Sequence, residues 1–149
     1  MKNALVTGGS GGIGAAICRR LANDGCHVYI HAHHGRQAAQ TLADAIAAEG
    51  GSAQVLTFDV TDSAAVADAL APLIENQPIQ ILVNNAAIHD DAVFPGMRAE
   101  QWHRVIDVSL NGFFNVTQPL LMPMIRSRWG RIINVSSIAA LTGNHGQVN

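Results

Sequence analysis

The residues best suited to chemistry lie near the N-terminus, where glycines gather in the stretch Thr7-Gly8-Gly9-Ser10-Gly11-Gly12-Ile13-Gly14. Glycine allows a tight turn and lets a phosphate approach the backbone, and the first N–H groups of a following helix attract anions. The stretch follows an apolar segment, 2–7, and opens a helical pattern, 12–25. That position between strand and helix predicts a dinucleotide pyrophosphate site, formed by Gly8, Ser10, Gly11, Gly12, Ile13 and Gly14.

A group of basic side chains follows the second apolar segment, 27–32. In dinucleotide sites of this kind an acidic residue at the end of the second strand binds the ribose 2′-OH of NAD, whereas an arginine accommodates the 2′-phosphate of NADP. Ala32 ends the segment, and no acidic residue follows it before position 40. Arg36 and a partly charged His33 favour a phosphate, so NADP is the predicted cofactor. No Cys or carboxylate lies near the histidines of "HAHH", and no metal site is predicted.

The elements that position these groups alternate along the chain. Apolar segments predict strands over 2–7, 27–32, 53–60, 79–87 and 130–137. Helical spacing predicts helices over 12–25, 36–51, 63–76 and 99–128, the third capped by Asp62 or Ser63 and the last kinked by Pro119 and Pro123. This alternation predicts an α/β fold, a Rossmann-type doubly wound parallel sheet of five strands with helices on both faces. Ligands of such sheets bind at the carboxyl ends of the strands.

Composition narrows the class of protein. The 149 residues have the length of one domain, and they are 48% hydrophobic and 13% charged, which indicates a packed core. A net charge of −2 argues against a nucleic-acid partner. No apolar run reaches the roughly 20 residues of a membrane span. Cys18 and Cys26 form no metal motif or disulfide framework, so we expect two reduced thiols in a cytoplasmic protein.

Four short stretches resemble the short-chain dehydrogenase/reductase family. Starting at Thr7 the glycine stretch reads T-G-x-x-x-G-I-G, and the others are "DVTD" (59–62), "NNAA" (84–87) and "INVSS" (133–137). They occur in the family's order and span nearly the whole chain. The closing "TGNHGQVN" (142–149) is similar to bacterial 3-oxoacyl-acyl-carrier-protein reductases. The resemblance implies that NADPH reduces a 3-oxoacyl thioester to its 3-hydroxyacyl form by hydride transfer.

The resemblance also implies roles for residues at the strand ends. Asp59 and the backbone of Val60 would meet the adenine, and Asn85 and Ala86 would line the cofactor ribose. Ser137 would be catalytic, donating a hydrogen bond to the carbonyl oxygen that gains negative charge. Its neighbour Ser136 should point to the opposite face of the strand. Asn84 is expected to join strands rather than to touch a ligand.

Two departures concern the proton relay of the family. Ser109 stands where the family often has an asparagine. As a second catalytic residue it would either hold a relay water with a shorter side chain or leave the relay weaker. Asn111 lies about 200° away around a helix and cannot substitute for it. The resemblance places the family's catalytic tyrosine directly after Asn149, with its lysine one helical turn further. We therefore expect residues 1–149 to be the N-terminal part of a single reductase domain and to be inactive alone.

Substrate and partners are expected at the loops 88–97 and 138–149. The implied substrate is carried on the acidic acyl-carrier protein, for which Arg128, flanked by Arg126 and Arg131, would be a docking residue. The helix predicted over 99–128 carries more apolar surface than one sheet face needs, which predicts a homodimer or homotetramer.

Two alternatives stay open. One keeps the fold and changes the substrate to a polyketide, sugar or steroid-like ketone. The other is a nonenzymatic dinucleotide-binding subunit that pairs with an active partner.

Overall fold

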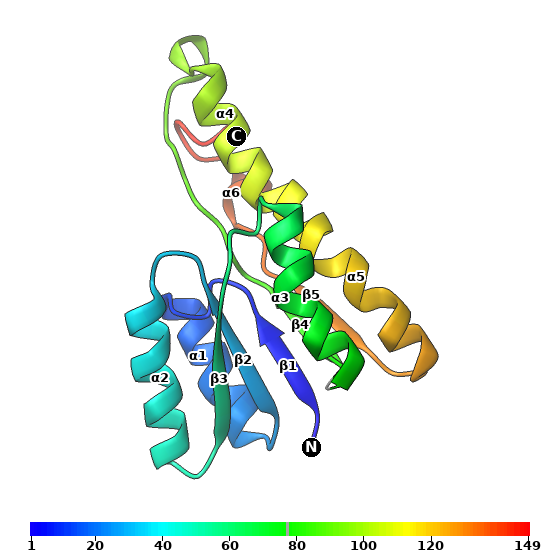
Figure 1. The fold of residues 1–149 in the computed structure, drawn as a ribbon. Coiled ribbons are helices and arrows are strands. Elements are labelled where there is room, and N and C mark those ends of the chain that lie inside the picture. The colour runs from blue at the N-terminus through cyan, green and yellow to red at the C-terminus, as the bar shows by residue number, and fades with distance from the viewer. Residues whose placement is uncertain (77) are drawn as a thin grey trace.

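The computed structural model describes residues 1–76 and 78–149, and these form one parallel sheet (Figure 1). The strand order is β3-β2-β1-β4-β5, with every neighbouring pair parallel. The strands are β1 (Asn3–Val6), β2 (His27–Ala32), β3 (Ser52–Thr57), β4 (Ile81–Asn84) and β5 (Arg131–Asn134). The predicted fold class is confirmed. The predicted strand 27–32 coincides with β2, and each of the other four predicted strands extends past the observed one at one or both ends.

Helices cover both faces of the sheet. Figure 1 views the sheet nearly edge-on, with α1 (Gly12–Asn23) and α2 (Arg36–Ala48) on one side and α3 (Ser63–Asn76) and α5 (Gly112–Arg126) on the other. Side chains alternate between the two cores along β1, because successive strand residues face opposite ways. Ala4 and Val6 belong to the core under α1 and α2, whereas Leu5 belongs to the core under α3 and α5.

The helix predicted over 99–128 is interrupted, although not at its prolines. It consists of α4 (Ala99–Ile106), a π-helical segment η2 (Asp107–Asn111) and α5, which continues through Pro119 and Pro123. A π segment inserts one extra residue per turn into the hydrogen-bond ladder. A departure from α-helical geometry therefore lies around Ser109. The helix continues through both prolines, and the kink expected at them stays a prediction.

Shorter elements complete the chain: a 3₁₀ turn η1 (Phe94–Gly96) and a final short helix α6 (Ala139–Thr142). In Figure 1, α4 projects beyond the carboxyl ends of the strands, and the C-terminal segment lies beside it. Within the described residues, no helix is long and apolar enough to cross a membrane.

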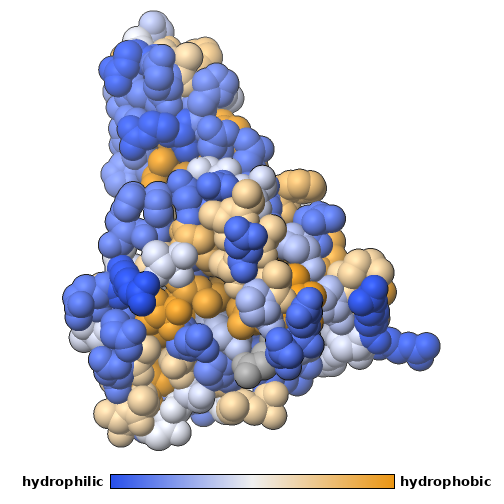
Figure 2. All heavy atoms as spheres, in the orientation of Figure 1, coloured by the Kyte–Doolittle hydropathy of each residue, from blue (hydrophilic) through white to orange (hydrophobic). Residues whose placement is uncertain are grey.

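The two edges of the sheet differ in cover. At one edge, four of the six residues of β3 are partly buried. Figure 2 shows apolar residues at the surface between α2 and α3. On β5 at the other edge, all four residues are exposed. Ile132 and Ile133 point to opposite faces and are 38% and 45% exposed, so the described residues leave both faces of β5 open.

Candidate functional site

Strand order reverses between β1 and β4. The chain leaves β1 toward β2 on one side and returns to β4 on the other, so the crossovers after these two neighbouring strands diverge. This divergence opens a crevice at the carboxyl ends of the strands, which is where α/β sheets bind ligands. The glycine stretch follows β1 and the "NNAA" stretch follows β4, as the sequence predicted.

The glycine loop is closely packed on its inner side. Gly8 has a φ of +62°, which an L side chain rarely adopts, and a Cβ there would lie 3.0 Å from the Cα of Ala86. A Cβ on Gly14 would collide with the carbonyl oxygen of Gly8 and lie 2.8 Å from the Cα of Gly9. Glycine is required at both positions because backbone lies against backbone there.

The outer side of the same loop is open. A Cβ on Gly12 would meet no atom within 4 Å, and one on Gly11 would meet only the Gly8 carbonyl at 3.5 Å. No side chain caps the N-terminus of α1, and its first N–H groups have no partner within the helix. The exposed side chain of Ile13 borders this opening. The opening and the free N–H groups fit the pyrophosphate of a dinucleotide.

Thr7 and Asn85 hold the inner side of the loop to β4. The Thr7 hydroxyl accepts hydrogen bonds from the backbone N–H groups of Asn85 and Ala86, both at 3.0 Å. The Asn85 amide nitrogen donates to the carbonyl oxygens of Thr7 at 2.9 Å and Gly8 at 3.1 Å. Thr7 was not among the predicted site residues, although its place at the end of a buried strand was a signal. That Asn85 and Ala86 contact a ribose stays a prediction.

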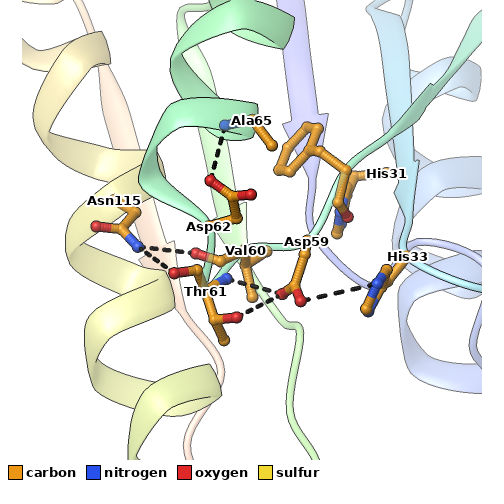
Figure 3. A network of polar contacts seen from close by, with 9 residues as sticks. His31, His33, Asp59, Val60, Thr61, Asp62, Ala65 and Asn115 are labelled. Carbon is orange, nitrogen blue, oxygen red and sulfur yellow. Dashed lines mark hydrogen bonds and ion pairs between the residues drawn. The ribbon is translucent and has the colours of Figure 1, made fainter.

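Asp59 forms a polar network at the end of β3 (Figure 3). Its Oδ1 accepts from the backbone N–H of Thr61 at 2.9 Å and from the Thr61 hydroxyl at 2.8 Å, and its Oδ2 lies 3.7 Å from His33 Nε2. Partial burial raises the pKa of Asp59, but the two bonds from Thr61 and the nearby His33 and His34 outweigh burial and hold this pKa below its usual value. The carboxylate is therefore ionised and turned toward the basic group after β2.

Asn115 of α5 forms hydrogen bonds with the backbone of the loop after β3. Its amide nitrogen donates to the backbone carbonyl of Val60 at 3.0 Å and so holds this loop against α5 (Figure 3). Asp62 Oδ1 accepts from the N–H groups of Ala64 and Ala65, so Asp62 rather than Ser63 caps α3. Asn115 was missed by sequence reasoning because only the fold brings α5 against the end of β3.

The basic group after β2 lies at the mouth of the glycine loop. Gly35 lies so close to Ser10 that a Cβ would stand 2.8 Å from the Ser10 hydroxyl oxygen. The rings of His33 and His34 stack with centroids 3.6 Å apart, and the side chain of Arg36 is exposed. Among the described residues, no three His, Cys, Asp or Glu side chains are grouped to hold a metal ion.

Ser109 lines a small cavity of about 90 Å³ at the ends of β4 and β5. The π geometry of η2 brings this side chain beside Ala86 and Ala87 of the "NNAA" stretch. Asn111 instead donates to the Asp107 carboxylate at 2.7 Å; that it cannot replace Ser109 stays a prediction. Asn84 donates to Asn134 Oδ1 at 2.9 Å and to the Thr117 hydroxyl at 3.1 Å. It joins β4 to β5 and α5, which confirms the prediction that it connects strands.

Ser137 does not line that cavity. Its side chain is exposed, and its hydroxyl oxygen accepts from the backbone N–H of Ala139 at 3.1 Å, at the start of α6. The structure thus places Ser109 and Ser137 at the same end of the sheet without bringing them into contact through the cavity. Catalytic roles for both stay predictions.

The two loops predicted to meet substrate lie against each other. The N–H of Ala92 donates to the carbonyl of Gly146 at 2.9 Å, and Gln147 Nε2 donates to the Asp91 carboxylate at 3.1 and 3.2 Å. Asn149 Nδ2 donates to the carbonyl oxygens of Asp90 and Gln101 at 3.0 and 3.2 Å. Segments 90–92 and 146–149 therefore form one wall beside α4.

The arginines lie elsewhere. Arg126 ends α5, Arg128 follows with a φ of 53°, and Arg131 begins β5. They are at the amino end of β5, the end of that strand opposite to Ser137. The Trp129 ring lies between two cations here, with Lys2 Nζ 3.5 Å and the Arg131 guanidinium 4.9 Å from its centroid.

A doubly wound parallel sheet with a glycine loop at its switch point defines the chain as a Rossmann-type dinucleotide-binding fold. The profile of the short chain dehydrogenase family matches residues 2–149. The chain therefore belongs to the short chain dehydrogenase family, whose members bind nicotinamide dinucleotides.

Individual relatives agree with this assignment. The chain is 42% identical to a 3-oxoacyl-[acyl-carrier-protein] reductase FabG of Aggregatibacter actinomycetemcomitans, over 97% of this chain and 61% of the relative. It is 45% identical to an acetoacetyl-CoA reductase of Allochromatium vinosum, over 98% of this chain and 60% of the relative. A solved gluconate 5-dehydrogenase from Burkholderia cenocepacia, in complex with NADP and tartrate, superposes with a TM-score of 0.90 at 34% identity, covering 99% of this chain and 58% of that one. The chain thus spans about three fifths of the length of these relatives.

Proposed function

We propose that this protein is an NADPH-dependent reductase that converts a 3-oxoacyl thioester, carried on acyl-carrier protein, into the 3-hydroxyacyl form. The observation that carries the proposal is the glycine loop, which is open to an anion on its outer side and is followed, at the end of β2, by His33 and Arg36 with no acidic residue between Ala32 and Gln40. The substrate class rests on the two relatives named for reduction of a 3-oxoacyl or acetoacetyl thioester.

Each residue then has a task in binding and catalysis. The N–H groups at the start of α1 hold the pyrophosphate, Asp59 and the Val60 backbone meet the adenine, and Asn85 and Ala86 meet a ribose. A bound NADPH supplies the hydride. The Ser137 hydroxyl donates to the carbonyl oxygen of the substrate as charge develops there. Ser109, exposed on the π segment, holds a water for proton supply.

Preference for NADPH is tested by neutralising one cation. Arg36→Gln should weaken binding of NADPH about tenfold, the scale of one charge-assisted bond of roughly 1.5 kcal/mol, and leave NADH binding unchanged. Arg20→Gln on α1, where Arg20 pairs with Asp24 at 2.9 Å, makes the same charge change away from the site. Equal losses for the two variants, or equal losses for the two cofactors, would contradict the assignment of Arg36.

The docking proposal predicts different effects of one substitution on KM for two thioester substrates. Arg128→Glu should raise KM for an acyl-carrier-protein thioester and leave KM for the corresponding coenzyme A thioester unchanged, because only the acidic carrier needs the basic patch. Arg20→Glu, at the end of α1 on the other face of the sheet, makes the same change of net charge and serves as the control. Association of two or four copies through the outer face of α5, where Phe114 and Ile125 are each 62% exposed, belongs to the same proposal and is read from the solution mass.

The domain assignment is likewise a proposal. We propose that residues 1–149 are the N-terminal part of one reductase domain, and that residues following them supply the tyrosine and lysine. The 149-residue polypeptide alone should then give no steady oxidation of NADPH with acetoacetyl-CoA, whereas the chain extended by its continuing gene sequence should. Turnover by a polypeptide whose intact mass is 15.7 kDa would contradict this.

A second candidate substrate comes from the solved neighbour, which is a gluconate 5-dehydrogenase. Comparison of kcat/KM for acetoacetyl-CoA and for 5-ketogluconate decides between a thioester ketone and a sugar-acid ketone. If neither is reduced while NADPH binds, the nonenzymatic dinucleotide-binding role is left.

A further inference from the structure

His31 is a buried polar side chain at the carboxyl end of β2, and all of its hydrogen-bonding atoms are engaged. It is 2% exposed, its Nδ1 accepts from the backbone N–H of Gly8 at 3.2 Å, and its Nε2 lies 2.9 Å from the carbonyl oxygen of Phe58. Its own carbonyl accepts from the N–H of Gly9 at 2.8 Å. One residue therefore joins the glycine loop to the end of β3.

These partners determine the protonation state of the imidazole. Gly8 offers an N–H, so Nδ1 must carry a lone pair, and Phe58 offers a carbonyl, so Nε2 must carry a hydrogen. Only the neutral tautomer with hydrogen on Nε2 satisfies both. A second proton, on Nδ1, would point at the N–H of Gly8 and remove that bond, leaving a buried donor unpaired.

The two ends of this bridge lie on either side of the crevice. Gly8 begins the glycine loop, and Phe58 directly precedes Asp59, the residue expected at the adenine. We propose that His31 is a positioning residue of the dinucleotide site: its neutral imidazole holds the glycine loop and the loop after β3 at one spacing, and its protonation releases Gly8 and weakens dinucleotide binding. This inference rests on the proposed dinucleotide site.

The surroundings favour the neutral form. Burial lowers the pKa of His31 most; the bond to Phe58 and the Asp59 carboxylate raise this pKa and His33 lowers it, and the net pKa is below its usual value of 6.5. His27 and Tyr29 are the other titratable side chains on this face of β2, and residues 7–14 and 84–87 contribute none. The imidazole is therefore neutral at pH 7 and takes up a proton only in more acidic solution.

The sign of the pH effect follows from linkage. Because the state that binds dinucleotide requires neutral His31, proton uptake competes with binding, and affinity falls by up to about tenfold for each pH unit below the His31 pKa. His33 acts in the opposite sense, since its positive charge would attract a 2′-phosphate. NAD⁺ is the suitable probe because it lacks the 2′-phosphate, a group that itself titrates near pH 6.

The experiment compares NAD⁺ affinity by calorimetry from about pH 4 to pH 8 in three proteins. The parent protein should keep its affinity above the His31 pKa and lose affinity as pH falls through that pKa, by up to about tenfold per pH unit. His31→Asn, whose amide oxygen can accept from Gly8 at the position of Nδ1, does not titrate and should change little with pH. It loses the bond to Phe58, so its affinity at pH 8 should lie below that of the parent. His27→Asn removes a histidine at the other end of β2, bonded to Ser52 at 2.6 Å, and should keep the parent's pH profile.

A second readout needs no ligand. Imidazole ¹⁵N resonances of the unliganded protein should show His31 with a protonated Nε2 and an unprotonated Nδ1 at pH 7.5. The amide protection factor of Gly8 should fall with the titration of that imidazole, but not in His31→Asn. The inference would be overturned if NAD⁺ affinity had the same pH dependence in the parent and in His31→Asn. It would also be overturned if the Gly8 protection factor did not change as the His31 imidazole titrates. If neither NAD⁺ nor NADP⁺ binds at any pH, the proposed function fails instead, and the Gly8 measurement still decides whether His31 controls the loop.

Discussion

Thr7 and Ser137 are hydroxyl side chains at the carboxyl ends of two strands of one sheet, and they are held very differently. Thr7, after β1, is 2% exposed, and its hydroxyl accepts two backbone N–H groups at 3.0 Å. Ser137, after β5, is exposed and accepts one N–H. The same contrast extends to the regions around them.

On the β1 side, the glycine loop is in contact with backbone, His31 and Asn85 on its inner face and is open only toward the crevice. On the β5 side, the strand and the segment after it are exposed, and Ile138 and Leu141 are 71% and 84% exposed. The dinucleotide side is thus preorganised by the described residues themselves. The reaction side has its candidate groups in place, but the described residues provide no buried shell around them.

The largest effect should appear on the reaction side and in turnover alone. Ser137→Ala should lower kcat about 100-fold or more in the active protein, the scale of one lost oxyanion donor, and leave NADPH affinity unchanged because Ser137 touches no part of the glycine loop. Ser136→Ala is the matched control and should keep kcat. Steady-state kinetics with acetoacetyl-CoA checks both, and a larger loss in the Ser136 variant would reverse the assignment of the pair.

The next effect should appear on the dinucleotide side and in stability. Gly14→Ala forces a Cβ against the backbone of Gly8 and Gly9, and we expect a loss of about 3 kcal/mol in the free energy of unfolding. Gly12→Ala adds the same methyl group where no atom lies within 4 Å. It should change stability by less than about 1 kcal/mol and still weaken NADPH binding, since the methyl enters the opening. Urea unfolding and cofactor titration separate the two, and equal stabilities would show that the loop is not tightly packed.

A smaller effect is expected from the support under the loop. Thr7→Val keeps the shape of the side chain and removes the acceptor of two partly buried N–H groups, which should cost about 2 kcal/mol. Thr41→Val makes the same exchange on the exposed face of α2, where the hydroxyl bonds only to the Gln37 carbonyl, and should stay within about 0.5 kcal/mol of the parent. Similar losses in both variants would mean that the intrinsic cost of valine, and not the lost acceptor, sets the result.

The smallest effect concerns Asp59 and pH. Because its folded pKa lies below the usual 3.8, ionised Asp59 contributes stability that is present above pH 4 and is lost as pH falls through the folded pKa. Asp59→Asn should therefore be less stable than the parent at pH 6 and approach it near pH 3. Thermal unfolding across this range checks the trend. A constant difference between the two proteins would assign the effect to shape rather than to charge.

Much of the fold could be predicted because its signals are local. Buried parallel strands appear as apolar runs such as 27–32, and helix starts carry caps such as Asp62, so strand–helix alternation specified the doubly wound sheet. The glycine loop was found for the same reason, since strand, turn and helix are contiguous in sequence. The π segment was not found, because a one-residue change in hydrogen-bond register leaves no composition signal.

The same distinction between local and long-range signals applies to the candidate site. Sequence alone determined the residue types at each strand end: glycines after β1, basic side chains without an acid after β2, and Asp59 after β3. Only the tertiary structure decided that His31 bridges Gly8 and Phe58, that Asn115 supports Val60, and that Thr7 holds Asn85. These pairs lie between 23 and 78 residues apart in sequence, and hydrogen bonds over such separations depend on strand order and register, which the pattern of any one segment does not contain.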